Sequence, residues 1–182
     1  MTSEEASPIS LRVNVARLPA RGMPVTIEAD SRQREALARV HSLLAVDRLD
    51  VELTVTAWKR GGVRIAGRVK AAIRQECIAT LEPIHEIVDE EIAALFVPEG
   101  SKLALPRLSH EGEIVLDAEG DDAPETFSGD EIDVGQLAEE FFALGINPYP
   151  RKPGVTVDSG SSVAGEMRGP LFDKLSQLRK KL

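Results

Sequence analysis

Two adjacent segments with strict alternation of apolar and polar residues constrain this chain more than any other feature. In LDVELTVTA, residues 49–57, every second residue is apolar, and alternation resumes in VRIAGRVKAAI, residues 63–73. Successive side chains of a strand point to opposite faces of a sheet, so each segment offers one face to a core and one to solvent. The intervening RGG, residues 60–62, supplies glycines that accept positive φ in a tight reversal. The sequence therefore predicts a long antiparallel hairpin.

Shorter alternating runs predict the other strands. They lie at residues 9–15, 25–27 and 84–97, with a very short strand at 114–116. Within 84–97 the alternation slips near Glu90 and Glu91, which indicates either a bulge or an edge strand.

Two helices are predicted from capping signals. Asp30 is followed three residues later by Gln33, and Asp133 by Gln136, so both places match the capping box. The first helix is expected over residues 31–45 and the second over 134–144, with buried stripes formed by Leu37, Val40 and Leu44 and by Val134, Leu137, Phe141 and Leu144. The expected fold is α+β: an antiparallel sheet, either a meander or a partly closed barrel, with two flanking helices and a flexible C-terminal tail.

Length and composition indicate the organisation of the chain. Its 182 residues, 42% of them hydrophobic, suit a single α+β domain at 1–154 that contains an acidic loop at 109–131. A flexible linker and a short basic helix are expected at 155–182. One cysteine forms no intramolecular disulfide, and no apolar run is long enough to span a bilayer, so we expect a soluble cytoplasmic protein.

Charge is distributed unevenly along the chain. Residues 1–108 hold 15 acidic and 15 basic side chains, residues 109–150 hold 12 acidic ones and no Lys or Arg, and residues 151–182 hold seven basic against three acidic. An acidic segment repels phosphates, so direct nucleic-acid contact is expected at the basic end. The acidic segment favours an alternative function, in which it binds a basic protein by charge complementarity. A solvated loop and a solubilising tail explain the same pattern without any partner.

The single cysteine, Cys77, raises the question of metal or nucleophilic chemistry. Steps of two from Ile73 reach Gln75 and then Cys77, so the thiol is expected on the inward face near the end of a strand. A zinc site needs about four Cys or His ligands, and the three histidines are far apart, at positions 41, 85 and 110. Nothing near the thiol marks a base or an oxyanion hole. We interpret Cys77 as a small buried hydrophobic residue, and we predict no catalytic residue, metal or cofactor.

An aromatic residue and two cations come together near the end of the acidic segment. Tyr149 lies between Pro148 and Pro150, directly before Arg151 and Lys152. Prolines on both sides restrict the backbone, which suits stacking of the ring on a base beside a paired phosphate. Packing of the tyrosine over the sheet is the structural alternative. The candidate contacts to RNA or a partner are Tyr149, Arg151, Lys152, Arg168, Lys174, Arg179, Lys180 and Lys181, the last five near Leu171, Leu175 and Leu178 at helical spacing.

Four segments in fixed order carry a family resemblance. They read GRVKAAIRQECIATLEPI (67–84), ALFVP (94–98), EIDVGQLAEEFFALGINPYPRKPG (131–154) and GPLFDKLSQLRKKL (169–182). In this order they resemble the YceD family, described as large ribosomal RNA subunit accumulation proteins, in its alphaproteobacterial form. The Asp-x-Gly-x-Leu-x-x-Glu pattern followed by PYPRKPG is the most specific part. The motif residues are Cys77, Glu82, Pro83, Asp133, Glu140, Pro148 and Pro150.

The resemblance implies a role without an established reaction. It implies a non-enzymatic factor that supports synthesis, processing or stability of large-subunit ribosomal RNA, with ribosomal RNA or a ribosome-associated protein as partner and no membrane or small-molecule substrate. The alternative is an adaptor whose acidic segment holds a basic ribosomal protein, with an indirect effect on RNA. Many relatives resemble this chain but carry further cysteines shortly after the first and after the proline-rich segment. Here residues 78–80 are Ile, Ala and Thr, and NPYPRKPG has no cysteine, so no metal cluster carries over.

Overall fold

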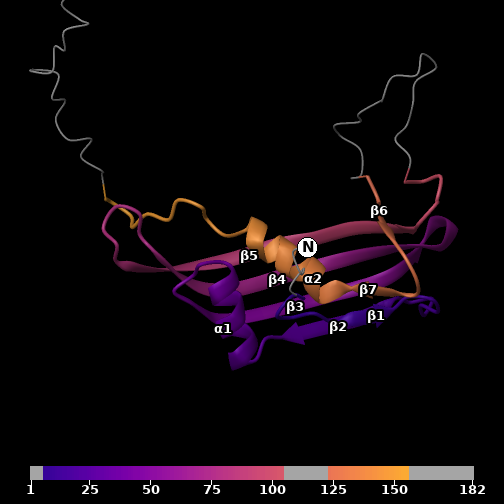
Figure 1. Cartoon of the computed structure of the whole chain (residues 1–182), viewed down its shortest axis with the longest axis horizontal. Coiled ribbons are helices and arrows are strands. Elements are labelled where there is room, and N and C mark those ends of the chain that lie inside the picture. The colour runs from indigo at the N-terminus through magenta and orange to yellow at the C-terminus, as the bar shows by residue number, and fades with distance from the viewer. Residues whose placement is uncertain (1–5, 105–122, 156–182) are drawn as a thin grey trace, which may run out of the picture.

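The computed structural model of the chain, shown in Figure 1, describes residues 6–104 and 123–155. Its main sheet has five strands in the order β2-β3-β4-β5-β6. The first four pair antiparallel with their neighbours in sequence, and β6 pairs parallel with the end of β5. The strands are β2 (Met23–Glu28), β3 (Ala45–Trp58), β4 (Gly62–Glu76), β5 (Pro83–Pro98) and β6 (Glu125–Phe127). The sheet is not closed, so the predicted α+β class is confirmed in its meander form.

Five smaller elements complete the described fold. Strands β1 (Arg12–Asn14) and β7 (Glu131–Asp133) form a separate antiparallel pair. Helix α1 (Ser31–Val40) packs against β3, and α2 (Val134–Leu144) lies across one face of the sheet (Figure 1). A 3-10 turn, η1 (Lys59–Gly61), joins β3 to β4. Within the described ranges, no helix is long and apolar enough to cross a membrane.

The predicted hairpin is confirmed and is longer than expected. Strands β3 and β4 pair from Trp58 opposite Gly62 to Ala45 opposite Arg74. The reversal uses positive φ at Arg60 and at Gly61, 54° and 78°. The alternating apolar residues of both strands face the core, where each fully buried aliphatic side chain contributes roughly 1.5–3 kcal/mol; they include Val51, Leu53, Val55, Ile65, Val69 and Ile73.

Helix α1 ends earlier than predicted. Instead of continuing to residue 45 it ends at Val40, because Ser42 adopts φ of 54°. The N–H of Leu43 donates to the Ala38 carbonyl, 2.8 Å, and that of Ser42 to Arg39, which is a Schellman termination. The predicted stripe is therefore partly wrong: Leu37 is buried, whereas Val40 and Leu44 are exposed.

Helix α2 has the predicted bounds but a rotated buried face. Val134 and Leu137 are buried as predicted, but Phe142 is fully buried while Phe141 is only partly buried against the core, and Leu144 is exposed. The capping box is also incomplete, because Asp133 accepts from the N–H of Gln136 while the Gln136 side chain turns to Glu140. The predicted box at Asp30 is confirmed in both directions.

Strand β5 pairs with β4 without a break in register, so the predicted bulge near Glu90 is wrong. The edge-strand alternative fits residues 83–95, because β6 pairs only with Phe96–Pro98. The register shift occurs in β3 instead, between Val46 and Arg48. Of the expected acidic loop, residues 123–131 are described, and they contain β6 and the first residue of β7. The possible strand at 114–116 and the tail helix lie outside the described residues.

Candidate interaction surface at the basic end

A compact turn joins β4 to β5 and begins at Cys77. The N–H of Cys77 donates to the Glu82 carbonyl, 2.9 Å, and the N–H of Leu81 donates back to the Cys77 carbonyl, 2.8 Å. The Thr80 hydroxyl accepts from the N–H of Glu82, 3.4 Å. Leu81 adopts φ of 60°, which is uncommon for a residue with a branched side chain. We call residues 77–82 the Cys77 turn.

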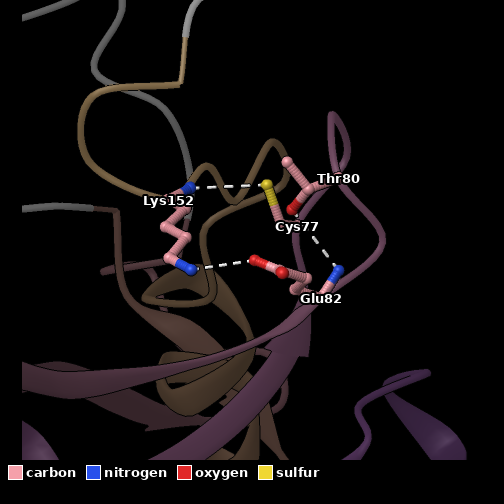
Figure 2. Close-up of polar contacts among 4 residues, drawn as sticks. All are labelled: Cys77, Thr80, Glu82 and Lys152. Atoms are coloured by element: carbon pink, nitrogen blue, oxygen red, sulfur yellow. Dashed lines mark hydrogen bonds and ion pairs between the residues drawn. The ribbon is translucent and has the colours of Figure 1, made fainter.

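The proline-rich segment after α2 runs back to this turn (Figure 1) and is joined to it at three points. The N–H of Ile78 donates to the Pro150 carbonyl, 3.0 Å. Figure 2 shows the other two: the N–H of Lys152 donates to Cys77 Sγ, 3.4 Å, and Lys152 Nζ lies 2.8 Å from Glu82 Oε2. Next to the turn, Gln75 Nε2 donates to the Asn147 carbonyl, 3.0 Å. Residues 70 to 75 positions apart in the sequence thus form one surface.

The sulfur of Cys77 is a hydrogen-bond acceptor in this arrangement. A hydrogen bond from the Thr80 hydroxyl, together with those from the N–H groups of Lys152, Ala79 and Thr80, lowers the pKa of the Cys77 thiol from 9.0 to about 7, although burial alone raises it. The thiolate is the form that accepts such bonds most strongly, so the turn stabilises its ionised state.

The prediction for Cys77 is therefore confirmed in part. The side chain is fully buried, as the alternation indicated. It does not belong to the continuous hydrophobic core, however, and polar groups surround its sulfur. The hydrophobic interpretation missed the contact from the Lys152 N–H, because spacing along a strand cannot show which backbone N–H groups a later segment brings to the same place.

Tyr149 and Arg151 point away from the domain. The tyrosine side chain is 71% exposed, so it does not pack over the sheet. Arg151 is exposed and has no ion pair within residues 6–104 and 123–155. Lys152 is different, because its hydrogen bond and charge interaction with Glu82 raise its pKa and lower that of Glu82. The five other predicted cations, from Arg168 to Lys181, lie outside the described residues.

A second polar cluster lies at the other end of α2. Asp133 caps the helix by accepting from the N–H groups of Gly135 and Gln136, and it also binds the Ser10 hydroxyl and the N–H of Leu11. Burial opposes ionisation of this carboxyl, but these hydrogen bonds outweigh it and lower its pKa. A Cβ added at Gly135 would lie 1.9 Å from the Ile9 carbonyl oxygen, so this helix accepts the N-terminal segment only with glycine there. We call this group the Asp133 clasp.

Further along the same helix, Glu139 is almost fully buried and lies 2.9 Å from Nε2 of His41, whose ring makes a T-shaped contact with that of Phe142. Burial raises the pKa of Glu139, and hydrogen bonds from His41 and Ser7 more than reverse this. Neither His41 nor Glu139 was anticipated from the sequence, since the two are 98 residues apart. The sequence offered one signal for a buried polar contact, because Glu139 is a single acidic residue on the apolar face of a predicted helix.

The motif residues do not all belong to the two clusters. Glu82 belongs to the Cys77 turn, Pro83 begins β5, and Pro148 and Pro150 flank Tyr149. Asp133 belongs to the clasp, whereas Glu140 is exposed and accepts from Gln136, 3.2 Å. Sequence reasoning missed Gln75 and Thr80. The part of the chain that the structure describes contains no group of three or more His, Cys, Asp or Glu residues able to hold a metal ion.

The fold and this surface together define a class of protein. It is an α+β protein with an open β-sheet that presents an aromatic and cationic surface at one end. The model of the family described as "Large ribosomal RNA subunit accumulation protein YceD" matches residues 65–178, and the chain belongs to this family. Membership implies a role in large-subunit ribosomal RNA accumulation, hence in ribosome biogenesis. Comparisons with curated proteins and with solved structures gave no match.

Proposed function

We propose that this chain is a non-enzymatic, cytoplasmic factor that supports large-subunit ribosomal RNA by contacting RNA directly through its basic end. The observation that carries the proposal is the exposed Tyr149 ring, which lies near Arg151 on a segment joined to the Cys77 turn. Arg151 has no ion pair with any residue that the structure describes. A ring held in this way stacks on an unpaired base with little loss of conformational entropy, and the guanidinium pairs with the adjacent phosphate. Family membership supplies the RNA class.

The hydrogen bonds at Pro150 and Lys152 hold the proposed contact residues in place. They fix the backbone immediately after Tyr149, so the ring and the Arg151 side chain start from a defined position. Lys152 contributes less charge to RNA than its sequence position indicated, because Glu82 already neutralises it. Arg151 is therefore the main phosphate contact among the described residues.

The test is RNA affinity over a salt series, with transcribed large-subunit ribosomal RNA as the probe. Tyr149→Ala should weaken binding at every salt concentration, by about 1–3 kcal/mol for one lost stacking contact. Arg151→Ala should weaken binding and flatten the dependence of log K on log salt by somewhat less than one unit. Arg21→Ala is the matched control, because Arg21 is also exposed and has no ion pair in the described part of the chain but lies away from this surface. Equal binding by all three variants and the unchanged chain would contradict the proposal.

A second candidate function follows from a different surface. Residues 123–150 contain six acidic residues and no Lys or Arg, and burial, followed by the charge of Glu140, raises the pKa of Glu125. Burial is the larger cause, and the smaller one shows that Glu125 and Glu140 repel each other, a repulsion that a basic protein would relieve. Tight capture of a basic ribosomal protein by the full chain, lost in a Glu125→Gln/Glu140→Gln variant and without any RNA binding, would favour this adaptor role over direct RNA contact.

A further inference from the structure

Strand β5 forms one margin of the main sheet (Figure 1). One side of the strand pairs with β4 from Pro83 to Phe96. The other side pairs only with β6, over Phe96–Pro98. Among the described residues, the outer side of β5 therefore has no strand partner before residue 96. We call residues 85–93 the β5 edge.

The register identifies which backbone groups of β5 face outward. One step beyond the last strand pair, the N–H of Cys77 donates to the carbonyl of Glu82, so every second residue counted from Glu82 directs its N–H and C=O to β4. The residues between them direct both groups away from β4. At the far end Glu99, which is in this second phase, donates its N–H to Phe127 just after β6, in agreement with this assignment. The outward-facing residues of the edge, all of them exposed, are His85, Ile87, Asp89, Glu91 and Ala93.

The β5 edge lacks features that commonly prevent a strand from pairing with another chain. Native edge strands are often short, or are interrupted by proline or a bulge. The opposite margin of the sheet has such protection, because β2 is six residues long and contains Pro24. Strand β5 has no proline between Pro83 and Pro98, and its register with β4 does not shift. An uninterrupted edge of this length is a template for an added strand.

The side chains along the edge favour a basic strand as the partner. Residues 86–91 hold four acidic side chains, and the whole of β5 has no Lys or Arg. Ion pairs from Arg68 and Lys70 of β4 compensate only Asp89. A lysine or arginine directly opposite Glu91 would form a favourable cross-strand pair. The same charges would repel the phosphates of RNA.

A second copy of the chain fits this edge poorly. A two-fold antiparallel pairing centred on residue 89, 90 or 91 would place acidic side chains directly opposite one another. Like charges in that position are destabilising. The charge of the edge therefore selects against self-pairing and in favour of a basic strand.

We propose that the β5 edge binds an extended, basic segment of a partner protein as an added antiparallel strand, with Lys or Arg of that segment opposite Asp89 and Glu91. Backbone hydrogen bonds to the outward-facing groups supply the affinity, and the carboxylates supply the selectivity. The proposal depends neither on RNA contact at the basic end nor on Glu125 and Glu140.

The test uses the full chain and the synthetic peptide KVKVKVK, which places its lysines on one face when it is extended. With lysines opposite Asp89 and Glu91, the lysine N–H groups face the edge and the valine N–H groups face away from it. Methylating the backbone nitrogens of the two inner lysines should therefore weaken binding about tenfold or more, because two hydrogen bonds are lost. Methylating the backbone nitrogens of two valines, at the same charge, should preserve binding. Equal affinity of the two methylated peptides, or no binding of the unmodified one, would overturn the proposal.

Amide hydrogen exchange locates the bound peptide. At a free peptide concentration ten times Kd, exchange of the N–H groups of Ile87, Asp89 and Glu91 should be about tenfold slower than in the free chain, because only the unoccupied edge exchanges. Protection of these groups in the free chain would show that another segment already occupies the edge. Protection only at other residues would place the peptide on another surface. Either result would contradict the proposal.

A pair of charge variants separates the edge from the net charge of the chain. Glu91→Lys should weaken binding of KVKVKVK about fivefold, because a like charge replaces an opposite one across the two strands. Glu28→Lys makes the same change at an exposed position of β2, on the opposite margin of the sheet, and should alter the affinity by less than about twofold. Equal losses in both variants would show that net charge alone attracts the peptide, which would refute the assigned site.

Discussion

The Asp133 clasp and the Cys77 turn are two polar clusters at opposite ends of α2, and they have different structural roles. In the clasp, a partly buried carboxylate binds the backbone of the N-terminal segment and helix α2 at once. In the turn, a buried sulfur and an exposed ion pair hold a loop whose apolar side chains remain in solvent. The family motif therefore contains residues that secure the core and residues that fix the shape of an exposed surface. The following substitutions separate these two roles, beginning with the largest expected effect.

Gly135→Ala should cause the largest loss of stability. The added Cβ would lie 1.9 Å from the Ile9 carbonyl oxygen, so the N-terminal segment has to move away from α2. We expect a loss of about 3 kcal/mol in the free energy of unfolding, measured by urea denaturation. Gln136→Ala, at the next and exposed position, should change it by less than about 0.5 kcal/mol. Similar midpoints for both variants would mean that the clasp does not hold the segment.

Asp133→Ala should lower the free energy of unfolding by about 2 kcal/mol, because it removes a helix cap and leaves the Leu11 N–H without its acceptor. The pKa of this carboxyl is below its ordinary 3.8, so its contribution is present above that value and is lost as the pH falls through the lower folded-state pKa. Urea midpoints measured below about pH 4 should fall less steeply for Asp133→Asn than for the unchanged chain. Parallel pH profiles would contradict ionisation of this group in the clasp.

At Cys77 the expected effect is smaller and depends on the replacement. Serine retains an acceptor for the N–H of Lys152, whereas alanine removes it, so Cys77→Ala should be the less stable variant. The folded-state pKa of about 7 lies below the ordinary 9.0, so the thiolate contributes stability above 9.0 and loses it as the pH falls through about 7. Stability of the unchanged chain relative to Cys77→Ser should therefore rise between these two pH values. A flat difference across that range would show that the thiol does not ionise in the turn.

Lys152→Met should have the smallest effect on stability. Its ion pair with Glu82 is exposed, and exposed pairs contribute little to the free energy of unfolding. The backbone N–H that binds Cys77 remains, so we expect an unfolding midpoint within experimental error of the unchanged chain. Lys70→Met, which removes a similarly exposed partner of Asp89, is the matched control. A large loss confined to Lys152→Met would mean that the ion pair, and not the N–H to sulfur bond, closes the turn.

The sequence itself determined the long hairpin, both helix starts and the burial of Cys77. These features depend on neighbours within a few residues: strict alternation over residues 49–73, the side chains of Asp30 and Asp133 next to free helix N–H groups, and steps of two from Ile73. Local spacing and capping chemistry are therefore enough to predict these features without knowledge of the tertiary contacts.

The tertiary structure alone decided where α1 ends, which face of α2 is buried and what surrounds the sulfur. Ser42 takes a left-handed conformation because the chain has to enter β3, and no local pattern required it. Phe142 replaces Phe141 in the core because the inner face of the sheet and His41 receive it. The Lys152 N–H reaches Cys77 from 75 residues away, and the Ser10 hydroxyl reaches Asp133 from 123. Contacts at such separations depend on how the elements pack against one another, which the order of residues does not encode locally.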